Sequence, residues 1–118
     1  MNVTETIKNL EGRKDIDLGI KHNFSDNLYA KEMKIPQGYM CGTHCHKYSH
    51  LSILGKGKVI VKTDNSSQEY TAPACINIEA GVMHMILALE DSVWYCIHAT
   101  EETNIDNIDE TLIMKEGT

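Results

Sequence analysis

The chain has 118 residues, which suits one domain and leaves little room for a second. Its hydrophobic content of 42% and charged content of 24% are those of an ordinary soluble globular protein. The formal net charge of -6 disfavours nucleic acid or an anionic membrane as the main partner.

No stretch of the sequence reaches the length of a transmembrane helix, and the N-terminal stretch MNVTETIKNLEGRKD lacks the apolar core of a signal peptide. We therefore expect a cytoplasmic protein. In that setting the four cysteines are expected to be reduced thiols: Cys41, Cys45, Cys75 and Cys96. Because Arg13 is the single arginine, a site for phosphate or carboxylate would use lysine, a metal or backbone amides.

The first 27 residues are polar and are expected to form an N-terminal segment, with one short element around residues 16–20. A pattern of short apolar and β-branched runs begins at Leu28 and predicts an all-β domain over residues 28–100. The runs are LYAKEMKI, HLSILGKG, KVIVKT, QEYTAP, ACINIEAG, HMILAL and VWYCIHAT. DNSS at 64–67 is expected to be a hairpin turn. In the tail, residues 101–118, the helical spacing of Ile105, Ile108 and Leu112 predicts a short C-terminal helix packed on the outside of the β domain.

The stretch GTHCHKYSH, residues 42–50, holds three of the six histidines. Residues two apart in a strand face the same side, so His44 and His46 are expected to point together while Cys45 points away. Two imidazoles on one face can bind a divalent metal, because each offers a neutral nitrogen lone pair. Two ligands are too few for a tight site, and His50 and His84 are the available additions.

Other interpretations of this stretch stay open at this point. CGTHCH, residues 41–46, contains Cys-x3-Cys-His, which is one residue longer than the usual haem attachment motif. A structural zinc site could use Cys41 or Cys45 with histidine, although the chain has enough apolar residues to fold without zinc. Solvated surface histidines are the third alternative.

The glycines that flank the cluster extend the pattern. Gly38 is followed by His44, His46, His50 and Gly57, with five, one, three and six residues between successive members. This spacing resembles the first signature motif of the cupin superfamily, G(X)5HXH(X)3-4E(X)6G. The one departure is a histidine at residue 50, where the family usually has glutamate.

A second segment, PACINIEAGVMHMILA at residues 73–88, is similar to the second cupin motif, G(X)5PXG(X)2H(X)3N. Gly81 and His84 are in register with the motif. Pro73, Glu79 and Ala88 replace its first glycine, its proline and its asparagine. Fifteen residues separate the two motifs, as in the shortest microbial members.

The resemblance implies a small antiparallel cupin β-barrel, also called a double-stranded β-helix or jelly roll, with one metal inside. The ligands carried over from the motifs are His44, His46, His50 and His84, which is the four-histidine type of site. It implies one divalent transition metal, which could be Fe, Mn, Ni, Co, Cu or Zn. Four neutral ligands leave the metal its full charge, which favours an anionic substrate or a hydroxide. If His50 swings out, a three-histidine site remains.

Two further residues are candidates for a catalytic role. His98 in VWYCIHAT shares a strand face with Trp94 and Cys96, and if that face points inward His98 could support a metal ligand or act as a general base. Tyr48 lies between His46 and His50 and is expected either in the turn between two strands or in the lining of the pocket. A structural role is the alternative for His98.

The cupin fold hosts dioxygenases, isomerases, lyases, sugar-binding regulators and storage proteins, so the fold does not decide the function. We expect a metal-dependent, dioxygenase-like enzyme that acts on a small polar or anionic metabolite. The alternatives are a metal-dependent lyase or isomerase and a non-catalytic module that senses a ligand or metal. Small cupins commonly pair through barrel strands or exchanged N-terminal segments, which implies a homodimer.

Overall fold

The computed structural model describes residues 18–42, 47–101, 104 and 108. This part of the chain forms nine β-strands, which confirms the predicted all-β class. The strands are β1 (Lys21–Ser25), β2 (Leu28–Ile35), β3 (Met40–Gly42), β4 (His50–Lys56), β5 (Lys58–Lys62), β6 (Ser67–Thr71), β7 (Ala74–Ile78), β8 (Met85–Ala88) and β9 (Ser92–Ala99).

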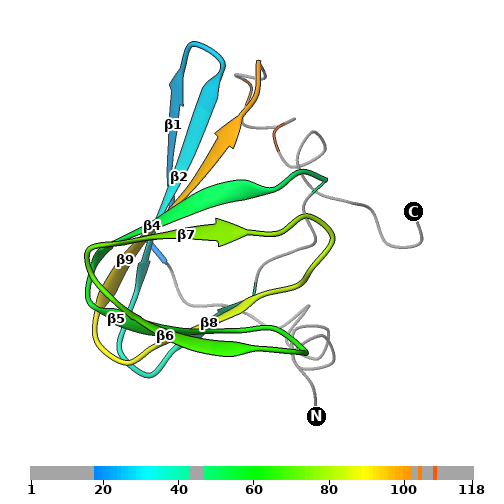
Figure 1. Cartoon of the computed structure of the whole chain (residues 1–118). Coiled ribbons are helices and arrows are strands. Elements are labelled where there is room, and N and C mark those ends of the chain that lie inside the picture. The colour runs from blue at the N-terminus through cyan, green and yellow to red at the C-terminus, as the bar shows by residue number, and fades with distance from the viewer. Residues whose placement is uncertain (1–17, 43–46, 102–103, 105–107, 109–118) are drawn as a thin grey trace.

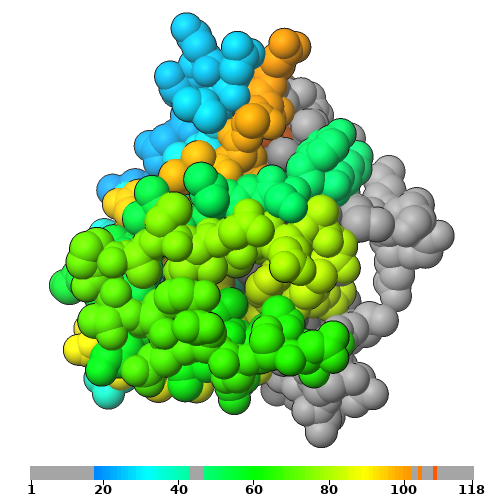
Figure 2. Space-filling model, in the orientation of Figure 1, coloured from blue at the N-terminus to red at the C-terminus, as the bar shows by residue number. Residues whose placement is uncertain are grey.

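The strands form two sheets that face each other (Figure 1). The first has the order β1-β2-β9-β4-β7 and the second the order β3-β8-β5-β6, and all the pairings are antiparallel. Strands far apart in sequence are neighbours, as β9 is of β2 and β4, which is the connectivity of a jelly roll. In the space-filling view the β5–β6 hairpin covers the lower part of the molecule, below β7 (Figure 2).

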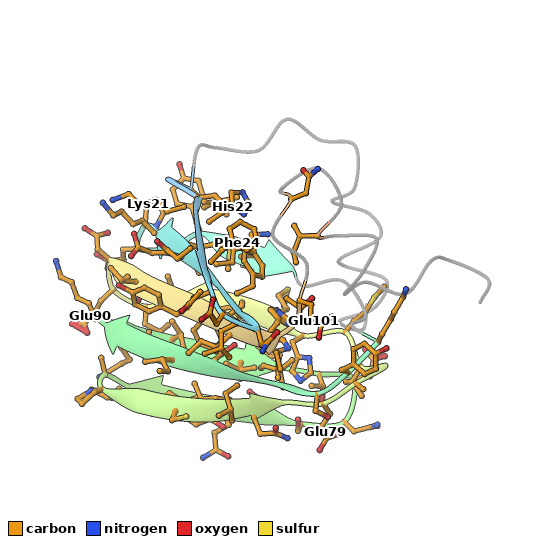
Figure 3. All side chains as sticks on the ribbon, turned by 90° about the horizontal axis from the view of Figure 1, so that it is seen from above. Lys21, His22, Phe24, Glu79, Glu90 and Glu101 are labelled. Carbon is orange, nitrogen blue, oxygen red and sulfur yellow. The ribbon has the colours of Figure 1, made fainter. Side chains whose placement is uncertain are left out.

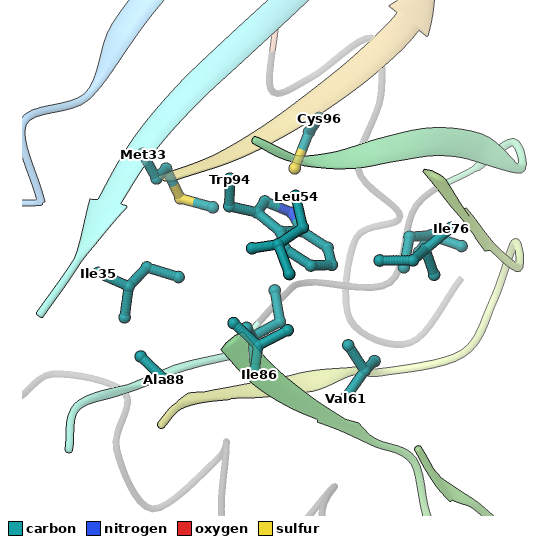
Figure 4. Close-up of a cluster of buried hydrophobic side chains, with 11 residues drawn as sticks. Met33, Ile35, Leu54, Val61, Ile76, Ile86, Ala88, Trp94 and Cys96 are labelled. Carbon is teal, nitrogen blue, oxygen red and sulfur yellow. The ribbon is translucent and has the colours of Figure 1, made fainter. Parts of the chain in front are cut away.

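The hydrophobic core lies between the two sheets (Figure 4). Trp94 on β9 and Leu54 on β4 come from the first sheet, and Val59 on β5 and Ile86 on β8 come from the second; each is 0% exposed. Because alternate residues of a strand face opposite sides, each strand contributes its inner set to this core. Burying one such side chain stabilises the fold by about 1.5–3 kcal/mol.

Each of the seven runs in the predicted barrel contains a strand, β2 and β4 to β9. The structure adds β3 and also β1, so the first sheet begins at Lys21, ahead of the predicted barrel start at Leu28. The run KHNFS of β1 has a single apolar residue, Phe24, because it is an edge strand whose outer positions are exposed. An edge strand next to solvent needs no continuous apolar pattern, which is why the sequence pattern did not reveal it.

The predicted turn at 64–67 closes the β5–β6 hairpin, where the amide of Thr63 donates to the carbonyl of Ser66 at 2.9 Å. Of the short element expected around residues 16–20, only residues 18–20 are described, and they are not in a strand or helix. The stretch of the predicted C-terminal helix lies outside the described residues apart from Asn104 and Ile108, of which Ile108 has a helical conformation, so the helix stays a prediction. Ile108 is 1% exposed and packs against Tyr29.

Within the described residues, no helix is both long enough and apolar enough to cross a membrane.

Candidate functional site

Two of the four predicted metal ligands, His44 and His46, lie outside the described residues. Among the described residues, no group of three or more histidine, cysteine, aspartate or glutamate side chains could hold a metal ion. The four-histidine ligand set therefore stays a prediction. The described part of the chain does show where His50, His84 and His98 lie.

His50 is the first residue of β4 and is 6% exposed. It shares the inner face of this strand with Ser52 and Leu54, because the three alternate with exposed residues. Its Nε2 atom lies 3.3 Å from the hydroxyl oxygen of Ser52. The side chain thus points into the interior between the sheets, as a ligand from the first motif should.

His98 is on β9, the neighbour of β4, and is 5% exposed. The inward face of β9 is the one that carries Trp94, Cys96 and His98, each of them buried. The ring centroids of His98 and His50 are 4.1 Å apart with the rings tilted by 31°. Two histidines separated by 48 positions of the sequence thereby become direct neighbours.

Tyr29 on β2 continues this row on the other side of His98. Its ring is 2% exposed and stacks on His98, with ring centroids 6.0 Å apart, and on Phe24, with centroids 4.9 Å apart. Its hydroxyl lies 2.7 Å from the Nδ1 atom of His22 on β1. Figure 3 shows His22 and Phe24 on one side of β1 and Lys21 on the other.

The motifs in the sequence did not indicate the contact of His22 with Tyr29. A signal was present in the sequence KHNFSDNLY, where Asn27 occupies the turn between two alternating runs and adopts a positive φ of 58°. Asparagine tolerates this left-handed conformation and so favours a hairpin there. That hairpin pairs β1 with β2 and brings His22 within reach of Tyr29.

His84 precedes β8, in the second sheet, and is 5% exposed. Its Nδ1 atom lies 3.0 Å from the carbonyl oxygen of Val82, so Nδ1–H is the donor and the neutral ring carries its lone pair on Nε2. Burial lowers the pKa of His84, while the bond to Val82 and the charge of Glu79 offset only part of that effect. The imidazole is thus held neutral, in one defined tautomer.

Tyr48 is 64% exposed and lies in a bend before β4. This position agrees with the turn role that the sequence also allowed. A catalytic role of Tyr48 stays a prediction.

Ser52 connects His50 to a buried thiol. Its hydroxyl lies 3.8 Å from the sulfur of Cys96 on the neighbouring strand and donates to it. Burial raises the pKa of the Cys96 thiol, and the Ser52 hydrogen bond and the charge of Lys31 lower it in part. Cys96 is therefore a neutral thiol on the inner face of β9.

No family model and no curated protein sequence matches this chain. Solved structures do match. KdgF from a Halomonas species is 17% identical with a TM-score of 0.61, over 80% of this chain and 90% of that one. An RmlC-like cupin from Shewanella frigidimarina is 22% identical with a TM-score of 0.60, over 79% and 85%. A cupin 2 domain-containing protein from Halorhodospira halophila is 14% identical with a TM-score of 0.62, over 86% and 79%.

Proposed function

Because the chain has the cupin fold, we propose that it binds one divalent transition metal and is a dioxygenase-like enzyme for a small polar or anionic metabolite. The observation that supports this proposal is the burial of three histidines in the interior of the fold: His50, His84 and His98. Burying a polar ring is costly unless it has a bonding role, and binding a metal is the role that the two sequence motifs imply.

The proposed ligands are His44, His46, His50 and His84. Of the described members, His84 fits a metal, because a ligating imidazole must be neutral and must have its second nitrogen held by a hydrogen-bond partner. His84 meets both conditions through its bond to Val82, which leaves Nε2 as the ligating atom. Bound there, the metal would supply Lewis acidity and open positions for substrate and dioxygen.

The remaining inner side chains prepare the site for a reaction. His98 packs on the ring of His50 and so stands where a base could take a proton from a substrate held beside the ligands. The hydroxyl of Tyr29 bonds to His22, and the ring of Tyr29 stacks on His98, so these two contacts hold the ring of His98 in position. Trp94 and Cys96 belong to the apolar core and share the inner face of β9 with His98, so this core would keep water away from that side of the site.

A metal-dependent lyase or isomerase is the second candidate. The observation that favours it is the contact of His98 with His50, since these reactions need a base close to the group that a metal polarises. A non-catalytic sensor of a ligand or metal would need the ligand set but no base.

The first experiment is elemental mass spectrometry of untagged protein, with His84→Ala and His44→Ala as ligand variants. The matched control is His22→Ala, a histidine outside the proposed ligand set. We expect about one transition metal per chain in the wild type and in the control, and loss of metal in both ligand variants. Absence of metal from the wild type, even after reconstitution, would refute the metal-binding and the enzymatic proposals together.

The bound metal then selects the activity assay. Oxygen consumption with a panel of small acids tests the dioxygenase proposal, and elimination and isomerisation screens test the alternative. His98→Gln keeps the size of the side chain but cannot act as a base. If His98→Gln retains the metal but loses turnover, the result would support His98 as the catalytic base. Full turnover in His98→Gln would exclude that role.

A homodimer is proposed to form through the outer face of the first sheet. Leu51 and Ile53 on β4 are 50% and 36% exposed, and they pair across strands with the partly buried Ile97 and Tyr95 on β9. An antiparallel sheet that covers a core usually turns polar residues outward, whereas β4 and β9 carry mainly apolar residues at their outward positions. A twofold-related copy presents the same patch, so the face is suited to pair with itself.

A further inference from the structure

Lys31 has an unusual position on β2. The buried residues Tyr29, Met33 and Ile35 mark the inner face of this strand. Lys31 lies on the same face, because it is two residues from both Tyr29 and Met33. It is partly buried. Lysine is among the residues least often buried without a charged partner, so its presence on an inner face needs a reason.

The other strand lysines point outward. The nine described strands contain six lysines: Lys21, Lys31, Lys34, Lys56, Lys58 and Lys62. Lys58 and Lys62 alternate with the buried Val59 and Val61, and Lys21 and Lys34 are exposed. Lys56 follows the β4 bulge and pairs with the outward Val93. Of these six lysines, Lys31 alone stands on an inner face.

The strands provide no acidic partner on that inner face. They contain two carboxylates, Glu32 and Glu69, and both are at outward positions. Glu32 forms an ion pair with Lys21, with Lys21 Nζ 3.9 Å from Glu32 Oε2, and Lys31 takes no part in it. In a chain with 17 acidic residues, the inner strand positions therefore carry one cation, histidines and no carboxylate.

Lys31 is close to the histidine site. It pairs in register with Cys96 on β9. The charge of Lys31 partly offsets the effect of burial, which raises the pKa of the Cys96 thiol. Tyr29, two residues earlier on the same face, stacks on His98. Lys31 and His98 are therefore diagonal neighbours on adjacent strands, and such neighbours are about 7–8 Å apart at the backbone. The lysine side chain is long enough for one small ligand to contact both its amine and His98.

We propose that Lys31 is the anion-binding residue of the interior site and that the ligand it receives there is a small molecule with a carboxylate group. This inference rests on the proposed function, which places a small ligand beside the histidines. A carboxylate that enters the interior must lose water, and it does so only where a cation or hydrogen-bond donors replace that water. Lys31 supplies the charge, and the four neutral ligands proposed for the metal leave the interior without a competing anion.

The test is an NMR titration of the full-length protein, read at the side-chain resonances of Lys31. Acetate, lactate and malonate serve as the carboxylate probes, and acetamide, lactamide and malonamide are their uncharged counterparts. Lys31→Met keeps the bulk of the side chain without its charge, and Lys31→Arg keeps the charge. Lys34→Met is the matched control, because it removes a charge from the outer face of the same strand.

We expect at least one carboxylate to shift the Lys31 resonances, with no shift from its amide. Lys31→Met should weaken the Kd of that carboxylate about ten- to hundredfold, as for loss of one charge-assisted hydrogen bond. Lys31→Arg and Lys34→Met should stay within about threefold of the wild type. An unchanged Kd in Lys31→Met, equal binding of the amides, or no shift from any carboxylate would overturn the proposal.

The titration is carried out on metal-loaded and on metal-free protein. If the chain binds no metal, the proposed function fails, while the shifts of the Lys31 resonances in metal-free protein still decide the role of Lys31. If Lys31→Met does not fold, the direct titration of wild-type Lys31 and the affinity of Lys31→Arg decide it.

Discussion

Replacing Gly57 by alanine should destabilise the protein far more than the same change at Gly38, although both glycines belong to the first motif. Gly57 lies between β4 and β5 and has a φ of +92°. A Cβ atom at this position would lie 2.5 Å from the carbonyl oxygen of Asp91 and 2.9 Å from the Cα atom of Ser92. Both are backbone atoms, which cannot move aside as the end of a side chain can.

The matched variant separates two costs. Gly38 has a φ of +85°, and a Cβ atom there would have no neighbour within 4 Å. Gly38→Ala therefore measures the cost of the left-handed backbone alone, about 1–2 kcal/mol. Gly57→Ala adds the overlap with the turn at Asp91, which costs about 1–3 kcal/mol as overpacking does. We expect a total loss of about 2–5 kcal/mol for Gly57→Ala.

The assay is urea-induced unfolding of the wild type and both variants at equal protein concentration. The unfolding midpoints should fall in the order wild type, Gly38→Ala, Gly57→Ala, with the dependence on urea unchanged. Equal losses in the two variants would refute the reasoning, because they would mean that the β8–β9 turn makes room for a methyl group at no cost.

Three further outcomes are expected. Ile53→Glu should convert the proposed dimer into a monomer in light scattering after size exclusion, because it places a charge in the apolar outer face of the first sheet. At pH 8 a maleimide reagent should label the exposed Cys75 in the native protein and leave Cys96 unlabelled, because Cys96 is buried and its raised pKa keeps it a neutral thiol. The hydrogen bond to Glu32 raises the pKa of Tyr95, so Glu32→Gln should make Tyr95 titrate at lower pH, measured by carbon NMR of its ring.

Each of these outcomes has a control. Met40→Glu changes an exposed apolar residue of the second sheet and should leave the dimer intact. Labelling in denaturant should make Cys96 reactive, and equal native rates for Cys75 and Cys96 would contradict the buried position of Cys96. For Tyr95, Lys21→Met removes the cation beside Glu32 and leaves the carboxylate in place, so the pKa of Tyr95 should stay raised. An unchanged pKa in Glu32→Gln would exclude the hydrogen bond as the main cause.

The sequence determined the strands that alternate strongly. In runs such as LYAKEMKI and KVIVKT the side chains that can be buried recur at every second residue, which predicts a strand. The structure has β2 and β5 in those runs. It also determined that Trp94, Cys96 and His98 share one face, because that follows from strand geometry alone. The two motifs pointed to the cupin fold, which the solved structures support.

Only the tertiary structure decided which face of each strand points inward. In β9 both alternating sets contain large apolar residues, so the pattern could not tell whether His98 faced the interior. The strand neighbours were equally hidden, because pairing joins residues as far apart as Tyr29 and His98 and depends on the closure of both sheets. Local sequence sets the period of a strand, but contact between distant strands sets its partners and its buried side. The contact of His50 with His98, the anchoring of Tyr29 by His22 and the inward position of Lys31 all follow from those long-range contacts.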